Sequence, residues 1–228
     1  MNLIKQSLFS PLKFKGTDDQ FLFWACSHFN HNPNWDEPIY KQRGYNSADE
    51  CRDGLILNWN KKSSHETIGF ILGDIMFGMG GAETFIKLLD RLNFKELCIC
   101  SGNHCAGFNA AIDLTDENGR YYFNSEKFVQ FLPNYFEAFV NGQAVVMSHY
   151  ALASWNGQAK GSYMLHGHCH GNLIKSELGK ILYTTRILEV SVENCPSPLT
   201  FGEIRKLMRD KEIKAFDHHT AATQNPFG

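Results

Sequence analysis

Side chains that commonly bind metal ions recur where apolar runs of this sequence end. These side chains belong to Cys26, His28, Asp74, Asn103, His104, His149, His168 and His170. Imidazole, carboxylate and amide oxygen together suit a transition metal such as zinc, iron or manganese. The sequence therefore predicts a metal site, provided that the fold brings these residues together.

Two pairs of these residues have a spacing of two. In extended backbone, residues at this spacing point to the same face, so Cys26 can act with His28, and His168 with His170. Taken singly, each residue has a simpler explanation; Asp74, for example, follows a glycine and would often be a turn or helix-cap residue. Five groups that each follow a strand-like run are harder to explain by turns or packing alone.

The first half of the chain contains the elements that would position these groups. Apolar runs at residues 21–26, 67–72 and 96–100 predict buried strands. An S-x-x-E capping box at residues 47–50 predicts a helix that runs to about residue 60, and apolar spacing predicts another helix over residues 82–92. This alternation predicts parallel pairing, in which the carboxyl ends of the strands open onto one crevice.

The second half of the chain shows a hairpin signal. Asn141 and Gly142 tolerate the positive φ angles of a tight turn, so residues 135–140 and 143–147 are predicted to pair as antiparallel strands. Further strands are predicted at residues 163–165, 181–184 and 187–192.

The remaining segments predict one domain. A capping box at residues 200–203 predicts a final helix, and the polar residues 109–119 are predicted to form a loop. Neither a repeat nor a convincing linker interrupts the chain, so we expect a single domain over residues 1–217. Residues 218–228 are predicted to form a disordered tail.

Composition narrows the functional classes. With 22 basic and 24 acidic residues the net charge is −2, so no global field favours a nucleic acid or a membrane surface. The seven cysteines are odd in number and contain no C-x-x-C pair, which is typical of a reducing compartment. The absence of a signal-peptide pattern and of a long apolar run adds to the expectation of a cytoplasmic protein without a membrane partner.

Five ordered motifs resemble a known family. The signature D-x-H, G-D, G-N-H, H and G-H-x-H of calcineurin-like metallophosphoesterases is matched, between about residues 21 and 208, by Cys26-Ser27-His28, Gly73-Asp74, Gly102-Asn103-His104, His149 and Gly167-His168-Cys169-His170. Segments at residues 58–60, 154–157 and 188–193 are similar to secondary features of its small bacterial and phage-type members. The resemblance implies an α/β fold, a four-layer α/β/β/α sandwich with the metal centre at the strand ends.

The resemblance also implies roles for individual residues. His28 and His170 would hold a first divalent metal ion, Asp74 would bridge two ions, and a second ion would be held by Asn103, His149 and His168. The ions would be zinc, manganese or iron. A metal-bridging hydroxide would hydrolyse a phosphomonoester or phosphodiester, with Asp74 and His104 as the catalytic residues.

Substrate contacts follow from the same resemblance. Asn103 and His104 would contact the phosphate, and His104 would protonate the leaving group as a general acid. His31 would line the pocket or pack behind it. Arg43 would meet a substrate phosphate or, more simply, lie on the surface. A small nucleotide-like substrate is expected, because no basic, aromatic-interleaved stretch is present to hold a long nucleic acid.

One position departs from the family pattern. Cys26 replaces the first aspartate of the signature, and it is either a thiolate ligand of a softer metal site or an inert buried cysteine. Cys105, where the family commonly has an acidic residue, is given no role. The competing interpretation is a non-catalytic scaffold protein with the phosphoesterase fold and an impaired first metal site. The oligomeric state is left open.

Overall fold

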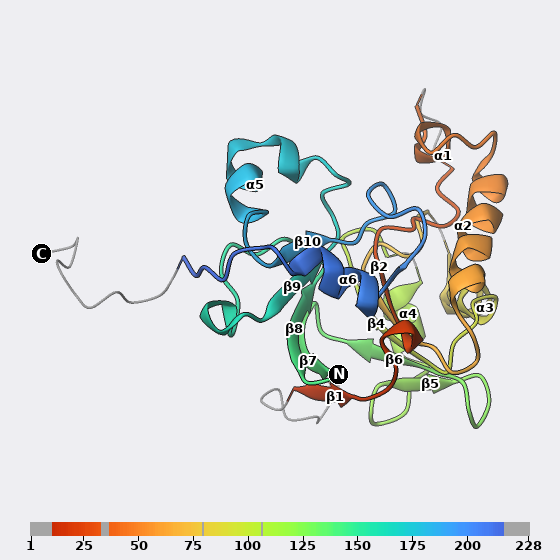
Figure 1. Ribbon diagram of the computed structural model, residues 1–228. Helices are drawn as coiled ribbons and strands as arrows, with labels where there is room; N and C mark the ends of the chain where they lie inside the picture. Colours follow the sequence, from red (N-terminus) through yellow and green to blue (C-terminus); the bar gives the residue numbers. More distant parts are fainter. Residues whose placement is uncertain (1–10, 33–36, 79, 106, 217–228) are drawn as a thin grey trace, which may run out of the picture.

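The computed structural model describes residues 11–32, 37–78, 80–105 and 107–216. These residues form an α/β protein with two mixed β-sheets and helices (Figure 1). The strands are β1 (Leu12–Phe14), β2 (Phe21–Trp24), β3 (Ile68–Leu72), β4 (Glu96–Cys100), β5 (Arg120–Tyr122), β6 (Phe128–Leu132), β7 (Tyr135–Val140), β8 (Gln143–Ser148), β9 (Tyr163–His166), β10 (Ile187–Glu189) and β11 (Leu199–Thr200). The α-helices are α1 (Ile39–Gln42), α2 (Ala48–Lys62), α3 (Ala82–Asp90), α4 (Phe108–Ile112), α5 (Glu177–Leu182) and α6 (Phe201–Met208), and the 3-10 helices are η1 (Asp18–Gln20), η2 (Gln158–Lys160) and η3 (Leu173–Lys175).

The larger sheet contains the three strands predicted in the first half of the chain. Its order is β11-β2-β3-β4-β6-β5, and β2, β3, β4 and β6 run parallel. Helices α2 and α3 connect successive strands, as the alternation predicts. Because β2, β3 and β4 are parallel and adjacent, their carboxyl ends open at one edge of the sheet.

The second sheet is built on the predicted hairpin. Its order is β1-β7-β8-β9-β10, and β7 and β8 pair antiparallel across Asn141 and Gly142. Both turn residues have positive φ, 48° and 82°, so the tight-turn prediction is confirmed. Strands β8, β9 and β10 are parallel, and their carboxyl ends also share one edge.

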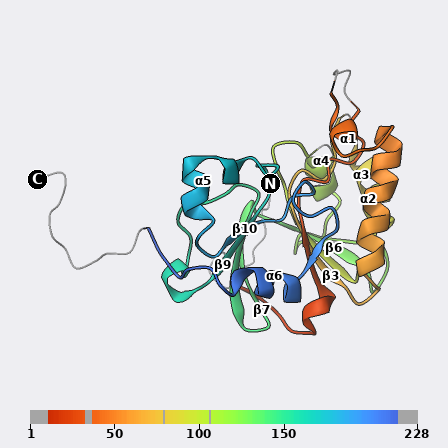
Figure 2. The same cartoon turned by 45° about the horizontal axis from the view of Figure 1, so that its top comes forward.

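Apolar side chains fill three spaces around the sheets. Alternate residues of the larger sheet point to opposite sides: Trp24 packs with α2 and α3, whereas Phe23 packs toward the second sheet and stacks on Phe70 at 4.7 Å. On the outer face of the second sheet, Val146 packs with Leu182 of α5. Helices α2 and α5 accordingly lie at opposite sides of the molecule (Figure 2).

The structure confirms two predicted helix starts. Ser47 caps α2 by accepting a hydrogen bond from the backbone N–H of Glu50 at 3.0 Å, but the Glu50 carboxylate receives the N–H of Asn46 instead of that of Ser47. At α6, Thr200 and Glu203 form the complete reciprocal capping box.

Several sequence predictions differ from the structure. The predicted strand at residues 181–184 is wrong, because Ile181 and Leu182 end helix α5, which Ser176 caps through the N–H of Gly179. The predicted loop at residues 109–119 contains most of α4. Strands β5 and β6 were not predicted. The predicted disordered tail lies outside the described residues. Among the described residues, no helix is both long and apolar enough to cross a bilayer.

Candidate metal centre

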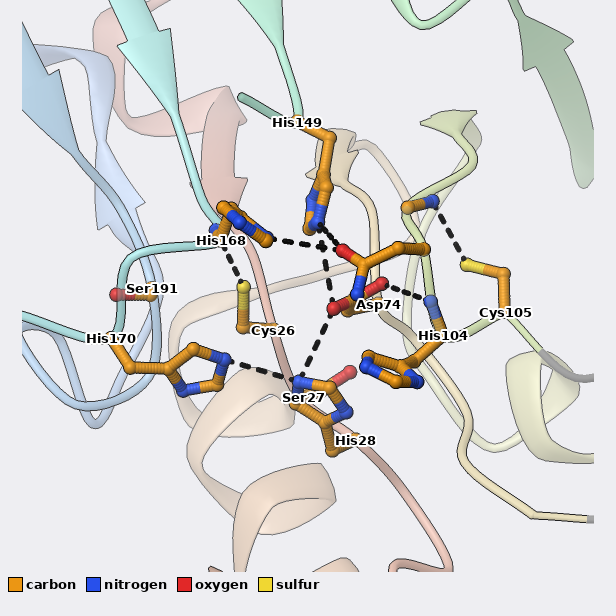
Figure 3. A network of polar contacts seen from close by, with 12 residues as sticks. Cys26, Ser27, His28, Asp74, His104, Cys105, His149, His168, His170 and Ser191 are labelled. Atoms are coloured by element: carbon orange, nitrogen blue, oxygen red, sulfur yellow. Dashed lines mark hydrogen bonds and ion pairs between the residues drawn. The ribbon is translucent and has the colours of Figure 1, made fainter. Parts of the chain in front are cut away.

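The ends of strands from both sheets meet at one site. The turns after β2, β3 and β4 of the larger sheet face the turns after β8 and β9 of the second sheet (Figure 3). A backbone bond joins the two halves, because Val192 donates to the carbonyl of Ala25; within the second sheet, Gly167 donates to the carbonyl of His149. The structure therefore brings together residues from positions 26 to 170 of the chain.

The candidate ligands form two adjoining groups. In each group, one ligand atom per residue can be chosen so that all of them lie within 4.8 Å of one another. The first group consists of Cys26, His28, Asp74 and His170, and the second of Asp74, His149 and His168. Asp74 is the shared member, as the family resemblance implies for a bridging residue.

The Asp74 carboxylate faces both groups. Its Oδ1 accepts a hydrogen bond from the backbone N–H of His104 at 2.8 Å. Its Oδ2 lies 3.4 Å from Nε2 of His28 and 3.5 Å from Nε2 of His149, so it stands between the two rings (Figure 3). Burial alone would raise the pKa of Asp74, but the hydrogen bond and charge of His149, with the N–H of His104, outweigh it and lower the pKa to about 2. The carboxylate is thus held in its ionised form.

The amide oxygen of Asn103, a ligand that the family resemblance implies for the second ion, lies beside the second group. Oδ1 of Asn103 lies 3.0 Å from Nε2 of His149 and 3.0 Å from Nδ1 of His168. Nδ1 of the buried His149 lies 2.9 Å from the carbonyl oxygen of Leu72, which can only accept. A neutral His149, the form that binds a metal ion, has its single N–H at Nδ1, so its Nε2 presents a lone pair to the oxygens of Asn103 and Asp74. Acceptor atoms that converge in this way fit a cation. In the absence of a metal ion, a proton on Nε2 would instead give Asp74 the hydrogen bond and charge that lower its pKa.

The first group shows the same convergence of lone pairs. Nδ1 of His170 lies 2.9 Å from the Glu193 carboxylate and donates to it, so Nε2 of a neutral His170 is an acceptor. This Nε2 lies 3.2 Å from Nε2 of His28, whose pKa burial lowers to about 3. Two ligands of one tetrahedral zinc ion, each ~2.0–2.1 Å from the metal, are about 3.3 Å apart. The histidine pair therefore has the separation of two ligands on one ion.

Cys26 supplies the sulfur atom of the first group. Its side chain is fully buried, and Sγ accepts a hydrogen bond from the backbone N–H of His168 at 3.0 Å. Burial raises the pKa of the Cys26 thiol. A bound cation has the opposite effect, because a coordinating thiol is deprotonated. The position fits a thiolate ligand, and it equally accommodates a neutral buried thiol.

The backbone around the site is strained. Five of the candidate ligands have positive φ, the left-handed region that L-residues other than glycine rarely adopt. They are Cys26 (56°), His28 (46°), Asp74 (51°), His168 (70°) and His170 (49°). This region costs roughly 1–2 kcal/mol per residue. Strain concentrated on these residues supports a function for the cluster.

The glycines of the motifs make room for the ligands. A Cβ on Gly102 would lie 2.0 Å from Oδ1 of Asp74, and one on Gly73 would lie 2.3 Å from Nδ1 of His149. A Cβ on Gly167 would lie 3.0 Å from Sγ of Cys26. The glycine in each motif is thus explained by close approach of a candidate ligand.

Besides Asn103, the residues assigned to substrate binding are His104 and His31, and both lie beside the candidate ligands. His104 is exposed, and its ring centroid lies 5.9 Å from that of His28 and 5.4 Å from that of Phe77. His31 is buried and packs on Phe77 at 4.3 Å, and burial lowers its pKa. His31 therefore has the position of a packed residue behind the site. On the other side, the half-exposed Tyr150 packs on His168 at 4.6 Å.

Two contacts of the site were not found in the sequence. Arg43 is not a surface residue: its side chain is 7% exposed, and it donates to the carbonyls of Cys26 and Ser27. Glu193, which contacts both Arg43 and His170, was noted only as part of a segment similar to the family. The alternation of apolar and polar residues from 188 to 193 was the available signal.

Comparisons with known proteins show the fold but no function. No family model matches the chain, and no curated protein matches it. Among solved structures, a crystal structure of a protein of unknown function from Aquifex aeolicus is similar, with a TM-score of 0.58 and 17% sequence identity. The match covers 82% of this chain and 98% of that chain. At this identity the likeness shows a shared α/β fold alone.

Proposed function

We propose that this protein is a metal-dependent phosphoesterase of the calcineurin-like type. The observation that carries the proposal is the pair of ligand groups that share Asp74 at the ends of four strands, with Asn103 added from the end of a fifth. The proposal includes the finer architecture, a four-layer α/β/β/α sandwich. The packing of α2 and α3 on one sheet, of the two sheets on each other, and of α5 on the second sheet supports that arrangement.

Each proposed metal ion has its own set of ligands. The first ion would be held by Cys26, His28, Asp74 and His170, and the second by Asp74, Asn103, His149 and His168. A pair of divalent ions supplies a water of lowered pKa and positive charge beside the phosphate oxygens. Nitrogen, oxygen and sulfur donors together favour zinc or iron in the first site.

The protein's own residues would orient the substrate and supply a proton. His104 is exposed beside His28, and its backbone N–H is already used to hold Asp74. Because the imidazole itself is exposed and does not hold Asp74, it would contact a phosphate oxygen and donate a proton to the departing alkoxide. General-acid catalysis of this kind contributes a factor of roughly 10²–10⁴ in rate. Asn103, whose amide oxygen faces the second group, would orient the phosphate through its amide nitrogen.

A small phosphoester is the substrate that the surroundings support best. The exposed ring of Tyr150 next to His168 offers a flat apolar surface to a nucleobase or a similar group. Arg43, which lies behind the first group, is occupied by two carbonyls and a carboxylate. A phosphate would therefore be recognised through the metal ions and neutral side chains.

One observation favours a second candidate function, a non-catalytic scaffold. Cys26 is fully buried and its thiol pKa is raised, which is what an inert cysteine in place of the family aspartate would show. Such a protein would bind at most one ion firmly and would not turn over substrate.

Metal content and hydrolysis together distinguish the two candidates. The protein is purified without chelator, analysed for bound metals, and assayed on bis-p-nitrophenyl phosphate and p-nitrophenyl phosphate. The phosphoesterase is expected to contain two divalent ions per chain and to lose hydrolysis after EDTA treatment, with recovery on addition of zinc or manganese. Fewer than two ions, with no hydrolysis under any metal, would establish the scaffold instead.

A further inference from the structure

The segment after β10 runs directly behind the turn that contains His168 and His170. Its apolar residues Val190 and Val192 are buried in two different clusters, while Glu189, Ser191 and Glu193 alternate with them. Ser191 pairs with Ala25 of the other sheet. This segment thus crosses from one sheet to the other, and Glu193 follows directly after the crossing.

Glu193 is the member of this segment that contacts a candidate ligand. Its Oε2 accepts the N–H of Nδ1 of His170 at 2.9 Å, while its Oε1 accepts from Nε and Nη2 of Arg43 at 3.0 and 2.6 Å. The Glu193 side chain is 24% exposed. Burial raises its pKa, but His170 and Arg43 outweigh burial and lower the pKa to about 2. One carboxylate therefore joins a candidate ligand to a buried arginine.

Arg43 continues the connection to the other half of the first group. Nη1 donates to the carbonyl of Ser27 at 2.6 Å, and Nη2 donates to the carbonyl of Cys26 at 2.7 Å. These carbonyls belong to the strained turn that presents Cys26 and His28. The planar guanidinium thus bonds the turn after β2 and, through Glu193, the turn after β9. Lysine could not reproduce this geometry, because its ammonium lacks the fixed fork of donors.

We propose that Arg43 and Glu193 are positioning residues that assemble the first metal site from its two halves. Glu193 selects the tautomer of His170 that carries its proton on Nδ1, which leaves Nε2 as the ligand atom. Arg43 holds Cys26 and His28 at a fixed distance from that Nε2. The inference rests on the proposed function, because it concerns the same site.

The chemistry of histidine ligands explains why a carboxylate partner matters. A histidine that donates its other N–H to a carboxylate is fixed in orientation and becomes a more basic ligand, and loss of such a partner typically lowers metal affinity roughly 10–100-fold. No residue of the second group contacts Arg43 or Glu193 in the hydrogen bonds and ion pairs of the described residues. The effect is therefore specific to the first ion.

The test is a zinc titration of Glu193→Gln and Arg43→Lys beside the wild-type protein. After chelator treatment, zinc affinities are measured by competition with a chromophoric chelator. We expect two sites in the wild type and, in both variants, one site weakened roughly 10–100-fold with the other unchanged. Glu83→Gln, which breaks the exposed Glu83–Lys87 pair, is the matched control and should keep both affinities.

The His170 tautomer is a second readout that general loss of stability would not change. Long-range proton–nitrogen NMR spectra of the zinc-loaded wild type should show His170 protonated at Nδ1. In Glu193→Leu no carboxylate accepts this N–H, so the proton should exchange faster with solvent, and in molecules that have lost the first ion it should move to Nε2. Glu193→Asp, which keeps the charge, should retain more first-site affinity than Glu193→Leu.

The possible outcomes separate this inference from the proposed function. If the wild type binds two zinc ions and both variants bind them with unchanged affinity, the positioning role is overturned while the phosphoesterase proposal stands. If the wild type itself binds no zinc, the proposed function fails and the positioning role fails with it. If a variant weakens both sites equally, the role specific to the first site is overturned.

Discussion

At the scale of single residues, Asp74 determines how the two groups can act together. It is the only candidate ligand common to both, and one of its oxygens is already engaged by the N–H of His104. The other oxygen faces His28 and His149 at nearly equal distances. In the proposed metal centre, this single carboxylate would serve two neighbouring ions.

Cys26 provides the first test at the residue scale. A thiolate gives more electron density to a metal than a carboxylate does, so the first site should prefer zinc or iron. Cys26→Asp should shift the preference toward manganese, and Cys26→Ala should lower the metal content toward one ion per chain and reduce hydrolysis. Metal analysis after equilibration with mixed divalent ions measures both effects. Unchanged stoichiometry and rate in Cys26→Ala would mean that the cysteine only packs.

His104 is expected to affect turnover without affecting metal content. Its side chain is exposed beside the ligands and belongs to neither ligand group, so His104→Ala removes a proton donor and leaves the ions bound. We expect turnover to fall roughly 10²–10⁴-fold for a substrate with a poor leaving group, and less for a nitrophenyl ester. Rates on both substrates, with metal analysis, check this. An equal loss on both substrates would contradict a proton-donor role.

At the scale of elements, the turns after the strands are shaped by close approach. The turns after β3 and β4 touch each other at Gly102, where a Cβ would lie 2.0 Å from Oδ1 and 2.6 Å from the backbone N of Asp74. The displaced atoms would include a carboxylate that both ligand groups share. A single methyl group at this position would therefore displace a ligand of both groups.

Gly102→Ala should abolish both metal sites while the sheets remain folded. No positive φ is required at Gly102, so the clash with Asp74 is the cause of the effect. We expect metal content near zero, no hydrolysis, and an unchanged far-UV circular dichroism spectrum. Gly81→Ala is the control, since a Cβ there meets nothing within 4 Å. Retention of both ions in Gly102→Ala would show that Asp74 is not shared.

The elements that positioned the site were predictable where the apolar pattern was unambiguous. Strands β2, β3 and β4 correspond to continuous apolar runs and are buried on both faces of the sheet. The last residue of each strand lies within two residues of the predicted end. The segment at residues 181–184 was ambiguous, because a short apolar run suits a strand or a helix. In the structure this segment ends helix α5, whose first turn is stabilised by the hydrogen bond from the N–H of Gly179 to the Ser176 hydroxyl. Residues 187–192 form a strand only to Glu189, since the chain then crosses to the other sheet at Ser191.

The site was predictable as a set of residues, but its supporting contacts were not. The residue types in Cys26-Ser27-His28 and His168-Cys169-His170 identified candidate ligands through local sequence. The reason given for their spacing was wrong, because both pairs have positive φ and do not lie in extended backbone. Arg43 and Glu193 meet across 150 residues of chain, and neither has a local pattern that indicates its partner. Backbone strain at the ligands was also invisible, because Cys, His and Asp rarely adopt positive φ without tertiary support.

At the scale of the whole molecule, the site joins the two sheets. The two sheets meet through the Phe23–Phe70 layer and through the backbone bridge between Ala25 and Ser191, and the ligand groups lie at the end of this contact. Without metal, the site is a group of acceptor atoms and strained residues that faces inward. The free energy of unfolding of the metal-free protein should therefore depend on the charges of these residues.

The last prediction concerns the pH dependence of that stability. The pKa of His28 falls from 6.5 to about 3 because the ring is buried, so between these values the unfolded chain binds a proton that the folded chain does not. The free energy of unfolding must then decrease as pH falls, by up to about 1.4 kcal/mol per pH unit for one such group. Burial lowers the pKa of His168 in the same direction.

Below pH 4.5 the carboxylates should make the loss steeper. The pKa values of Asp74 and Glu193 fall from 3.8 and 4.5, respectively, to about 2, so their stabilising contributions are complete above the unfolded values and are lost as pH falls toward 2. We expect guanidinium unfolding of the protein, after its metal ions are removed with a chelator, to give a free energy of unfolding that declines as pH falls from 6.5 to 4.5. Below pH 4.5 the decline should become steeper. His28→Gln should flatten the upper part of this profile, while His65→Gln, which removes an exposed histidine, is the control. A wild-type free energy that is constant from pH 6.5 to 4.5 would contradict the prediction, because a buried neutral His28 requires the decline.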